Sequence, residues 1–287
     1  MNEGESRVAW GLTWPAPAKL NLMLRIVGQR EDGYHLLQTV FQFIDLLDGL
    51  KFHQTATSTV TLRNPIPGVL AQEDLTVRAA LALQQYSGSD LGVEIELDKH
   101  IPMGGGLGGG SSDAATTLVV LNQLWGLGLT KQELMTIGLK LGADVPIFIF
   151  GSAAWAEGVG EQISAIDLPE KWMLVIKPEC HVNTKEIFCA KELTRDSKRI
   201  TISDFRAGQR VNDCLAVVEK FYQPVREAIN DLSRYSLARL TGTGACVYAE
   251  FGTLEEAELA KNALSTKWSV YLAKSMNKSP LYSMLEQ

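Results

Sequence analysis

The stretch whose residues point most directly to chemistry is the glycine run at residues 102–112, PMGGGLGGGSS. Glycine lacks a Cβ, so its backbone can take positive φ angles and approach a ligand closely. Free N–H groups leading into a helix N-terminus form a partly positive cradle for phosphate oxygens. A strand pattern before the run and a helix pattern after it favour phosphate binding over a merely flexible turn. The expected phosphate-binding residues are Pro102, Met103, Gly104, Gly105, Gly106, Leu107, Gly108, Gly109, Gly110, Ser111 and Ser112, with either serine able to cap the helix.

Other phosphate loops fit this run less well. A P-loop has a lysine directly after its last glycine, and this run continues into serine instead. Gly104, Gly106 and Gly109 match GxGxxG, but a dinucleotide fold also needs an acid at the end of a second strand about 20 residues on. Glu133 falls in that range within a helical pattern, so a dinucleotide-dependent oxidoreductase is disfavoured. The HRD and DFG motifs of protein kinases do not occur.

One charged residue outside the run, Asp144 in GADVP, could support phosphoryl transfer. That reaction asks a protein mainly to position two oxygens, offset charge and orient or deprotonate the attacking hydroxyl. Asp144 follows an expected helix end, where a short carboxylate can project into a cleft. From the residues alone, Asp144 is equally well explained as a turn residue before Pro146. Lys19, in PAKLN, is from the residues alone better explained as a solvated surface lysine.

Four motifs in order resemble one known family. PMGGGLGGGSSDAA resembles the central ATP-binding motif of the GHMP kinases, which include galactokinase, homoserine kinase, mevalonate kinase and phosphomevalonate kinase. PAPAKLNLMLRIVGQREDGYHLLQTVFQFIDL, GLKLGADVPIFIFG and LTGTGACVYAEF resemble the members that phosphorylate a hydroxyl of an isoprenoid precursor carrying a cytidine diphosphate group. The resemblance covers residues 15–281. Alternatives are a kinase of mevalonate or homoserine type, and a ligand sensor without catalytic activity on the same fold.

The resemblance implies roles for residues on the substrate side. Asp144 corresponds to the catalytic base, and Lys19 beside it would keep that carboxyl ionised and offset the charge of the migrating phosphoryl group. Asn21 faces the same side of the strand as Lys19 and would orient the substrate. A cytosine base needs flat stacking surfaces and hydrogen-bond partners. The implied cytidine pocket consists of Tyr34 and His35, with Phe188 as the opposing stacking surface, completed by Phe41 and Thr184.

The resemblance also implies contacts on the nucleotide side. Lys99 precedes the glycine run and is expected to reach a phosphate or the ribose. Asp74 stands where the family often has asparagine, and a carboxylate only accepts hydrogen bonds, so the contacts to adenine should differ here. Mg²⁺ should arrive with ATP, with Ser112 as a possible contact and no dedicated protein metal site. A small-residue turn is expected near the reacting phosphate, made of Thr241, Gly242, Thr243 and Gly244.

The pattern of expected elements gives an α+β fold. In the first half we expect strands over 19–27, 36–47 and 93–98, and helices over 74–86, 112–125 and 131–141, with Asp74 capping the first helix. In the second half we expect strands over 172–178, 246–251 and 268–275, and helices over 183–191, 213–221 and 253–264. The resemblance implies a two-domain GHMP kinase fold: an ATP-binding half like ribosomal protein S5 domain 2 (1–158) and a ferredoxin-like half (159–287).

Composition excludes several other classes. The chain has 287 residues, 46% hydrophobic, and a net charge of −6 with scattered basic residues, which argues against nucleic acid as a partner. The N-terminus lacks the basic start of a secretory signal, and no apolar run approaches the roughly 20 residues of a membrane span. The four cysteines form no CxxC pair and the four histidines no HExxH motif. We expect a cytoplasmic protein with buried thiols, a monomer or weak homodimer.

Overall fold

The computed structural model describes residues 9–286. Residues 1–8, where a secretory signal was not expected, and Gln287 lie outside the described part. The strands are β1 (Thr13–Gln29), β2 (His35–Gln54), β3 (Val60–Leu62), β4 (Val93–Asp98), β5 (Ala154–Gly158), β6 (Gln162–Ala165), β7 (Trp172–Lys177), β8 (Arg239–Leu240), β9 (Val247–Phe251) and β10 (Ser269–Met276). The helices are α1 (Leu75–Ser87), α2 (Gly109–Leu124), α3 (Lys131–Leu141), α4 (Val145–Phe150), α5 (Thr184–Cys189), α6 (Ile202–Arg206), α7 (Leu215–Phe221), α8 (Gln223–Leu232), α9 (Leu254–Leu264) and α10 (Pro280–Leu285).

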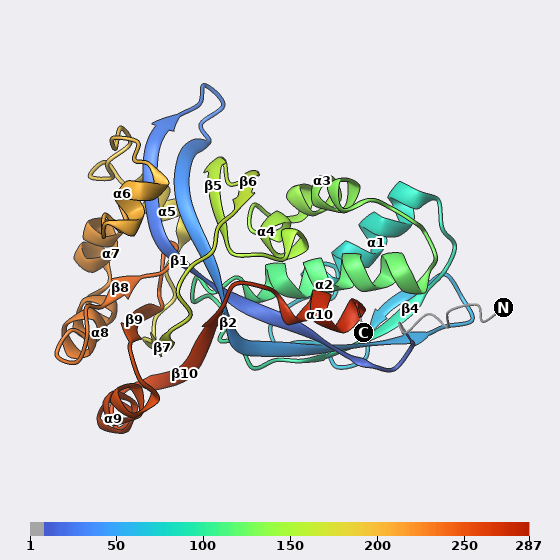
Figure 1. Ribbon diagram of the computed structural model, residues 1–287. Helices are drawn as coiled ribbons and strands as arrows, with labels where there is room; N and C mark the ends of the chain where they lie inside the picture. The colour runs from blue at the N-terminus through green and yellow to red at the C-terminus, as the bar shows by residue number, and fades with distance from the viewer. Residues whose placement is uncertain (1–8, 287) are drawn as a thin grey trace.

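Two long antiparallel strands, β1 and β2, run through both halves of the molecule (Figure 1). Both strand predictions in this region are confirmed, and both strands are longer than expected. Gly33, with φ +87°, provides the left-handed residue of the turn between them. Register shifts at Pro17/Ala18 and Asn21/Met23 mark bulges on either side of Lys19. Since a bulge locally bends and twists a strand, it can change where nearby side chains point.

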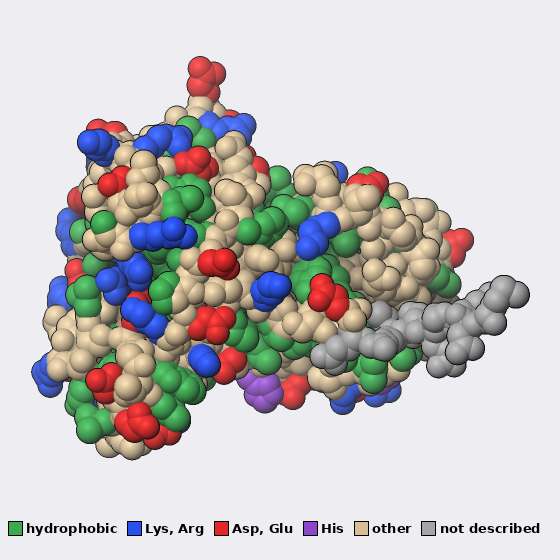
Figure 2. All heavy atoms as spheres, viewed as in Figure 1, with side chains coloured by type: hydrophobic (Ala, Val, Ile, Leu, Met, Phe, Trp, Pro, Cys, Tyr) green, Lys and Arg blue, Asp and Glu red, His purple; other side chains and the backbone are tan. Residues whose placement is uncertain are grey.

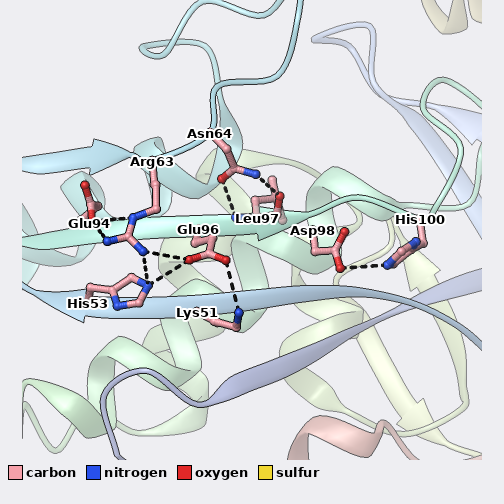
Figure 3. A network of polar contacts seen from close by, with 9 residues as sticks. All are labelled: Lys51, His53, Arg63, Asn64, Glu94, Glu96, Leu97, Asp98 and His100. Carbon is pink, nitrogen blue, oxygen red and sulfur yellow. Dashed lines mark hydrogen bonds and ion pairs between the residues drawn. The ribbon is translucent and has the colours of Figure 1, made fainter.

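The N-terminal half packs helices against one face of the sheet (Figure 1). Apolar side chains of β1, β2 and β4 meet those of α1 to α4 in one buried cluster, which includes Trp14, Phe52 and Leu118. The sheet order is β3-β4-β2-β10-β7-β9-β8, with β1 and β5 also paired to β2. On the exposed side of β2 and β4, Glu96 contacts Lys51, His53 and Arg63, and Arg63 also pairs with Glu94 (Figure 3).

The C-terminal half joins the same sheet through β10, which pairs with β7 along its length and with β2 at Ser275 and Met276. Its three expected strands and three expected helices are all present within a few residues. The sequence analysis did not predict α6, α8, α10 or the hairpin of β5 and β6. That hairpin spans the expected domain boundary at residue 158, and the boundary itself stays a prediction.

One expectation about a helix start is wrong. Helix α2 begins at Gly109 rather than Ser112, and its N-cap is Gly108 in a left-handed conformation, with no side-chain cap. Ser111 and Ser112 therefore lie inside the first turn, and neither caps the helix. The helix therefore begins at three consecutive glycines, Gly108, Gly109 and Gly110.

The remaining expectations concern cysteines and surface charge. Cys180, Cys189, Cys214 and Cys246 are all free thiols. Cys214 and Cys246 are buried as expected, whereas Cys180 is only partly buried and Cys189 is exposed, so the expectation of buried thiols is wrong at those two positions. Within residues 9–286 no helix is long and apolar enough to cross a membrane. Acidic and basic side chains are interspersed over the face shown in Figure 2.

Candidate active site

Three adjoining cavities lie along the junction of the two halves. The first, of about 400 Å³, is lined by the glycine run and is called the glycine-loop cavity. The second, of about 370 Å³, contains Lys19 and is called the central cavity. The third, of about 1090 Å³, contains His35 and is called the aromatic cavity. Asp144 lines the first two and Phe188 the last two, so the three form one continuous path.

Lys19 and Asp144 form an ion pair at the point where the first two cavities meet. Lys19 Nζ lies 3.1 Å from Asp144 Oδ2 and donates a hydrogen bond to Asn21 Oδ1 at 2.5 Å. The Lys19 side chain is 3% exposed and that of Asp144 38%, so the carboxyl faces the cavity while the ammonium is buried behind it. Phe41 lies beneath the ammonium, with its ring centroid 5.4 Å from Nζ. The structure brings together all four of these expected residues.

The glycine run takes left-handed conformations at Gly104, Gly106 and Gly108. A Cβ at Gly106 would lie 2.6 Å from the Thr241 carbonyl oxygen, and one at Gly108 would lie 2.8 Å from the Phe148 ring. Side chains cannot fit at these positions, so the backbone remains the lining of the cavity. Residues 102–111 line the glycine-loop cavity as expected, whereas Ser112 is fully buried and lines none of the three cavities.

The turn at residues 241–244 packs directly against the glycine run. The Cys246 N–H donates to Gly105 O at 3.0 Å, and the Asn21 N–H donates to Thr241 Oγ1 at 3.0 Å. Thr243 and Thr184 hydroxyls lie 2.9 Å apart. Gly242, Thr243 and Gly244 line the central cavity, while Thr241 is buried behind it. These contacts fix the turn beside the glycine run, and residues of both line the central cavity.

In the aromatic cavity, His35 stacks on Phe188 with ring centroids 5.0 Å apart and planes at 30°. Burial and, secondarily, the nearby Arg195 guanidinium lower the pKa of His35, and Arg195 Nε lies 3.2 Å from His35 Nε2. The two rings expected on opposite sides of a base therefore touch each other here. A flat ligand would stack on an outer face of this pair or separate the rings. Tyr34 is 65% exposed at the rim of the cavity.

Lys99 is surrounded by two carboxyls that the sequence analysis missed. Its Nζ donates to Asp48 Oδ2 and, at 2.7 Å, to Asp113 Oδ2. Burial lowers the pKa of Lys99, but the Asp113 and Asp48 carboxyls outweigh it and raise that pKa overall. Burial raises the pKa of Asp113 to about 8, with a further increase from Asp48 that Lys99 only partly offsets. The Lys99 ammonium, expected at a phosphate, is thus engaged by protein groups, although its side chain lines the glycine-loop cavity.

Asp48 connects this cluster to the start of the glycine run. Its Oδ1 accepts the backbone N–H groups of His100 at 2.6 Å and Ile101 at 2.8 Å. Asp74 also lines the glycine-loop cavity, and its side chain caps α1 by accepting the Thr76 N–H at 2.8 Å. A carboxylate suffices for this cap, so the residue type at position 74 is explained locally.

Comparison with known proteins identifies relatives over nearly the whole chain. Residues 74–152 match the GHMP kinases N terminal domain, and residues 193–270 match the GHMP kinases C terminal model. The 4-diphosphocytidyl-2-C-methyl-D-erythritol kinase of Methylococcus capsulatus is 56% identical over 96% of this chain and 95% of its own length. That of Nitrosococcus oceani is 52% identical over 96% of this chain and 99% of its own length.

Solved structures agree on the fold. A crystal structure of 4-(cytidine 5'-diphospho)-2C-methyl-D-erythritol kinase has a TM-score of 0.80 at 29% identity, covering 92% of this chain and 99% of that one. The Methanococcus jannaschii mevalonate kinase has a TM-score of 0.69 at 15% identity, covering 96% of this chain and 100% of that one, and shares the fold alone. The predicted α+β fold of the GHMP kinases is confirmed.

Proposed function

The chain belongs to the 4-diphosphocytidyl-2-C-methyl-D-erythritol kinases within the GHMP kinase family, and we propose that it phosphorylates the 2-hydroxyl of 4-diphosphocytidyl-2-C-methyl-D-erythritol. ATP supplies the γ-phosphoryl group, and the products are the 2-phosphate and ADP. This is a step of isoprenoid precursor biosynthesis by the non-mevalonate route. The single observation that carries the proposal is the position of Asp144, which lines both the glycine-loop cavity and the central cavity.

The transfer step follows from that position. The Asp144 carboxylate accepts the proton of the substrate hydroxyl, whose oxygen then forms a bond to the γ-phosphorus. The bond from that phosphorus to the bridging oxygen breaks, and ADP leaves with the electron pair. The buried Lys19 ammonium, 3.1 Å from Asp144, offsets the charge on the transferring group. Asn21, hydrogen-bonded to Lys19, orients the ammonium.

The nucleotide occupies the glycine-loop cavity in this proposal, with its phosphates on the backbone N–H groups at the start of α2. Mg²⁺ accompanies ATP and supplies further compensation of phosphate charge. Asp113 lines this cavity, and its Oδ1 is buried without a hydrogen-bond partner among residues 9–286. Burial raises its pKa to about 8, so at neutral pH the carboxyl is mostly protonated and would bind the ion only on losing that proton.

The cytidine end of the substrate lies in the aromatic cavity, against His35 and Phe188, with Tyr34 at the rim. Mevalonate and homoserine have no base to stack on such a pair. Residues 1–158 form the ATP-binding domain and residues 159–287 the second domain, which contributes Phe188 and Thr184. The enzyme works in the cytoplasm as a monomer or weak homodimer.

The proposal is tested by ADP release from ATP with each of three acceptors, the cytidyl substrate, mevalonate and homoserine. We expect turnover with the cytidyl substrate alone. Turnover with mevalonate or homoserine only would contradict the assignment of the substrate, and turnover with none would contradict the assignment of a kinase.

A further inference from the structure

His181 is a third titratable side chain in the central cavity, besides Lys19 and Asp144. The sequence analysis gave it no role. It follows β7 and precedes α5, so it reaches the cavity from the C-terminal half, opposite β1. Its ring is exposed and has no hydrogen-bond partner within the described part of the chain. A donor without a partner in such a cavity is available to a ligand.

The ring lies against the backbone of the glycine run. A Cβ at Gly104 would lie 3.0 Å from His181 Nδ1. Gly104 lines both the glycine-loop cavity and the central cavity. His181 therefore lies beside the passage through which the two reacting ligands must meet.

The segment that carries His181 is fixed on both sides. Lys177 Nζ donates to the carbonyl oxygens of Pro178 at 2.8 Å and Cys180 at 2.9 Å. Val182, the next residue, is 3% exposed in the core of the C-terminal half, and Asn183 caps α5. The backbone position of His181 is thus determined by contacts that do not involve its ring.

A ligand that bridges the aromatic cavity and Asp144 has to cross the central cavity. In the proposed substrate, a ribose and then a diphosphate lie between the base and the reacting alcohol. Lys19, the other hydrogen-bond donor with a titratable side chain in this cavity, is already engaged by Asp144 and Asn21. Resting on the function proposed above, we propose that His181 donates a hydrogen bond to the diphosphate of the cytidyl substrate and determines its affinity.

The experiment compares binding of CDP and of cytidine, which lacks the phosphates, to the full chain and to His181→Ala by titration calorimetry. CDP affinity should fall about 10-fold, as expected for a hydrogen bond to a charged group, while cytidine affinity stays unchanged. His181→Asn, which keeps an N–H donor near the position of Nδ1, should recover part of the loss. His100→Ala is the matched control, because that ring is exposed and lines none of the three cavities.

Steady-state kinetics complete the test. The KM for the cytidyl substrate should rise about 10-fold in His181→Ala, with the KM for ATP unchanged. The inference would be overturned if His181→Ala bound CDP and cytidine with equally reduced affinity. It would also be overturned if the KM for ATP rose instead of that for the cytidyl substrate, or if neither the affinities nor the KM values changed. If the wild-type protein neither turns over the cytidyl substrate nor binds CDP, the proposed function fails together with the inference. If the wild type does both and His181→Ala matches it, only the inference fails.

Discussion

Lys19 Nζ lies 3.1 Å from Asp144 Oδ2, with the ammonium buried and the carboxyl facing the cavity. The two residues come from β1 and from the N-terminal end of α4. The buried cation therefore has a single fixed position relative to the exposed carboxylate. In the proposed function, Asp144 takes the proton and Lys19 compensates charge, and this geometry is compatible with both roles.

Replacing Lys19 by methionine should lower kcat by about 100-fold or more, because the charge of the transferring phosphoryl group loses its compensation. Methionine fills much of the same buried volume, so the protein should remain folded. Steady-state kinetics with ATP and the cytidyl substrate measure the change. Lys51→Met, in the exposed network of Figure 3, is the control. Equal kcat values in the two variants would remove Lys19 from the mechanism.

Gly106→Ala should raise the KM for ATP and lower stability, because its Cβ would lie 2.6 Å from the Thr241 carbonyl oxygen. Gly126→Ala is a matched control, since Gly126 also has a positive φ but no atom within 4 Å of an added Cβ. Both variants share the backbone strain. The free energy of unfolding should fall about 1 kcal/mol or more further in Gly106→Ala. The free energy of unfolding is measured by chemical denaturation. Equal losses in Gly106→Ala and Gly126→Ala would show that the close contact at Gly106 does not affect stability.

Phe188→Ala should raise the KM for the cytidyl substrate about 10-fold, the usual effect of losing one stacking surface for a base. The KM for ATP should not change, because Phe188 lines the central and aromatic cavities and not the glycine-loop cavity. Phe221→Ala is the control, on the exposed face of α7. A larger increase in the KM for ATP than in the KM for the cytidyl substrate would show that the cytosine base does not bind against Phe188.

Asp113→Asn should change how stability depends on pH. Burial raises the pKa of Asp113 to about 8 in the folded protein, against about 4 in the unfolded chain. The folded state binds more protons between these values, so this group's contribution to stability is lost as pH rises from about 4 to about 8. Asparagine does not titrate. The Tm of Asp113→Asn minus that of wild type should therefore increase across this window.

Asp90→Asn is the control for this series, because Asp90 is exposed and has no ion-pair partner among the described residues, and its Tm difference from wild type should stay flat over the same range. If the Tm difference between Asp113→Asn and wild type is also independent of pH, the raised pKa of Asp113 is contradicted. The Lys99 contact can persist in Asp113→Asn through the amide oxygen.

Local patterns predicted most of the elements, and their failures have local causes. Helix α1 was placed correctly because Asp74 caps it and apolar residues follow at helical spacing. The sequence pattern predicts the start of α2 at Ser112 rather than Gly109, because glycine has a low helix propensity. In the structure, tertiary contacts override that low propensity. Helix α4 has only six residues, which are too few to show a helical periodicity of apolar residues in the sequence.

The site residues that could be predicted from the sequence are those that lie in recognisable motifs. Lys19, Asp144 and the glycine run lie in motifs, and they meet in space. Asp113 lies within the PMGGGLGGGSSDAA motif and Asp48 lies outside the quoted motifs, but no local pattern indicates their contact with Lys99, because it depends on how β2 packs beside α2. His181 likewise reaches the cavity only through the fold.

The most direct test of the account is the turnover of Asp144→Asn measured together with its ATP affinity. Removing the base while keeping the shape of the side chain should lower kcat by about 100- to 10,000-fold, with ATP affinity and folding essentially unchanged. Undiminished turnover in a variant that binds ATP normally would contradict the assignment of Asp144 as the group that prepares the attacking hydroxyl.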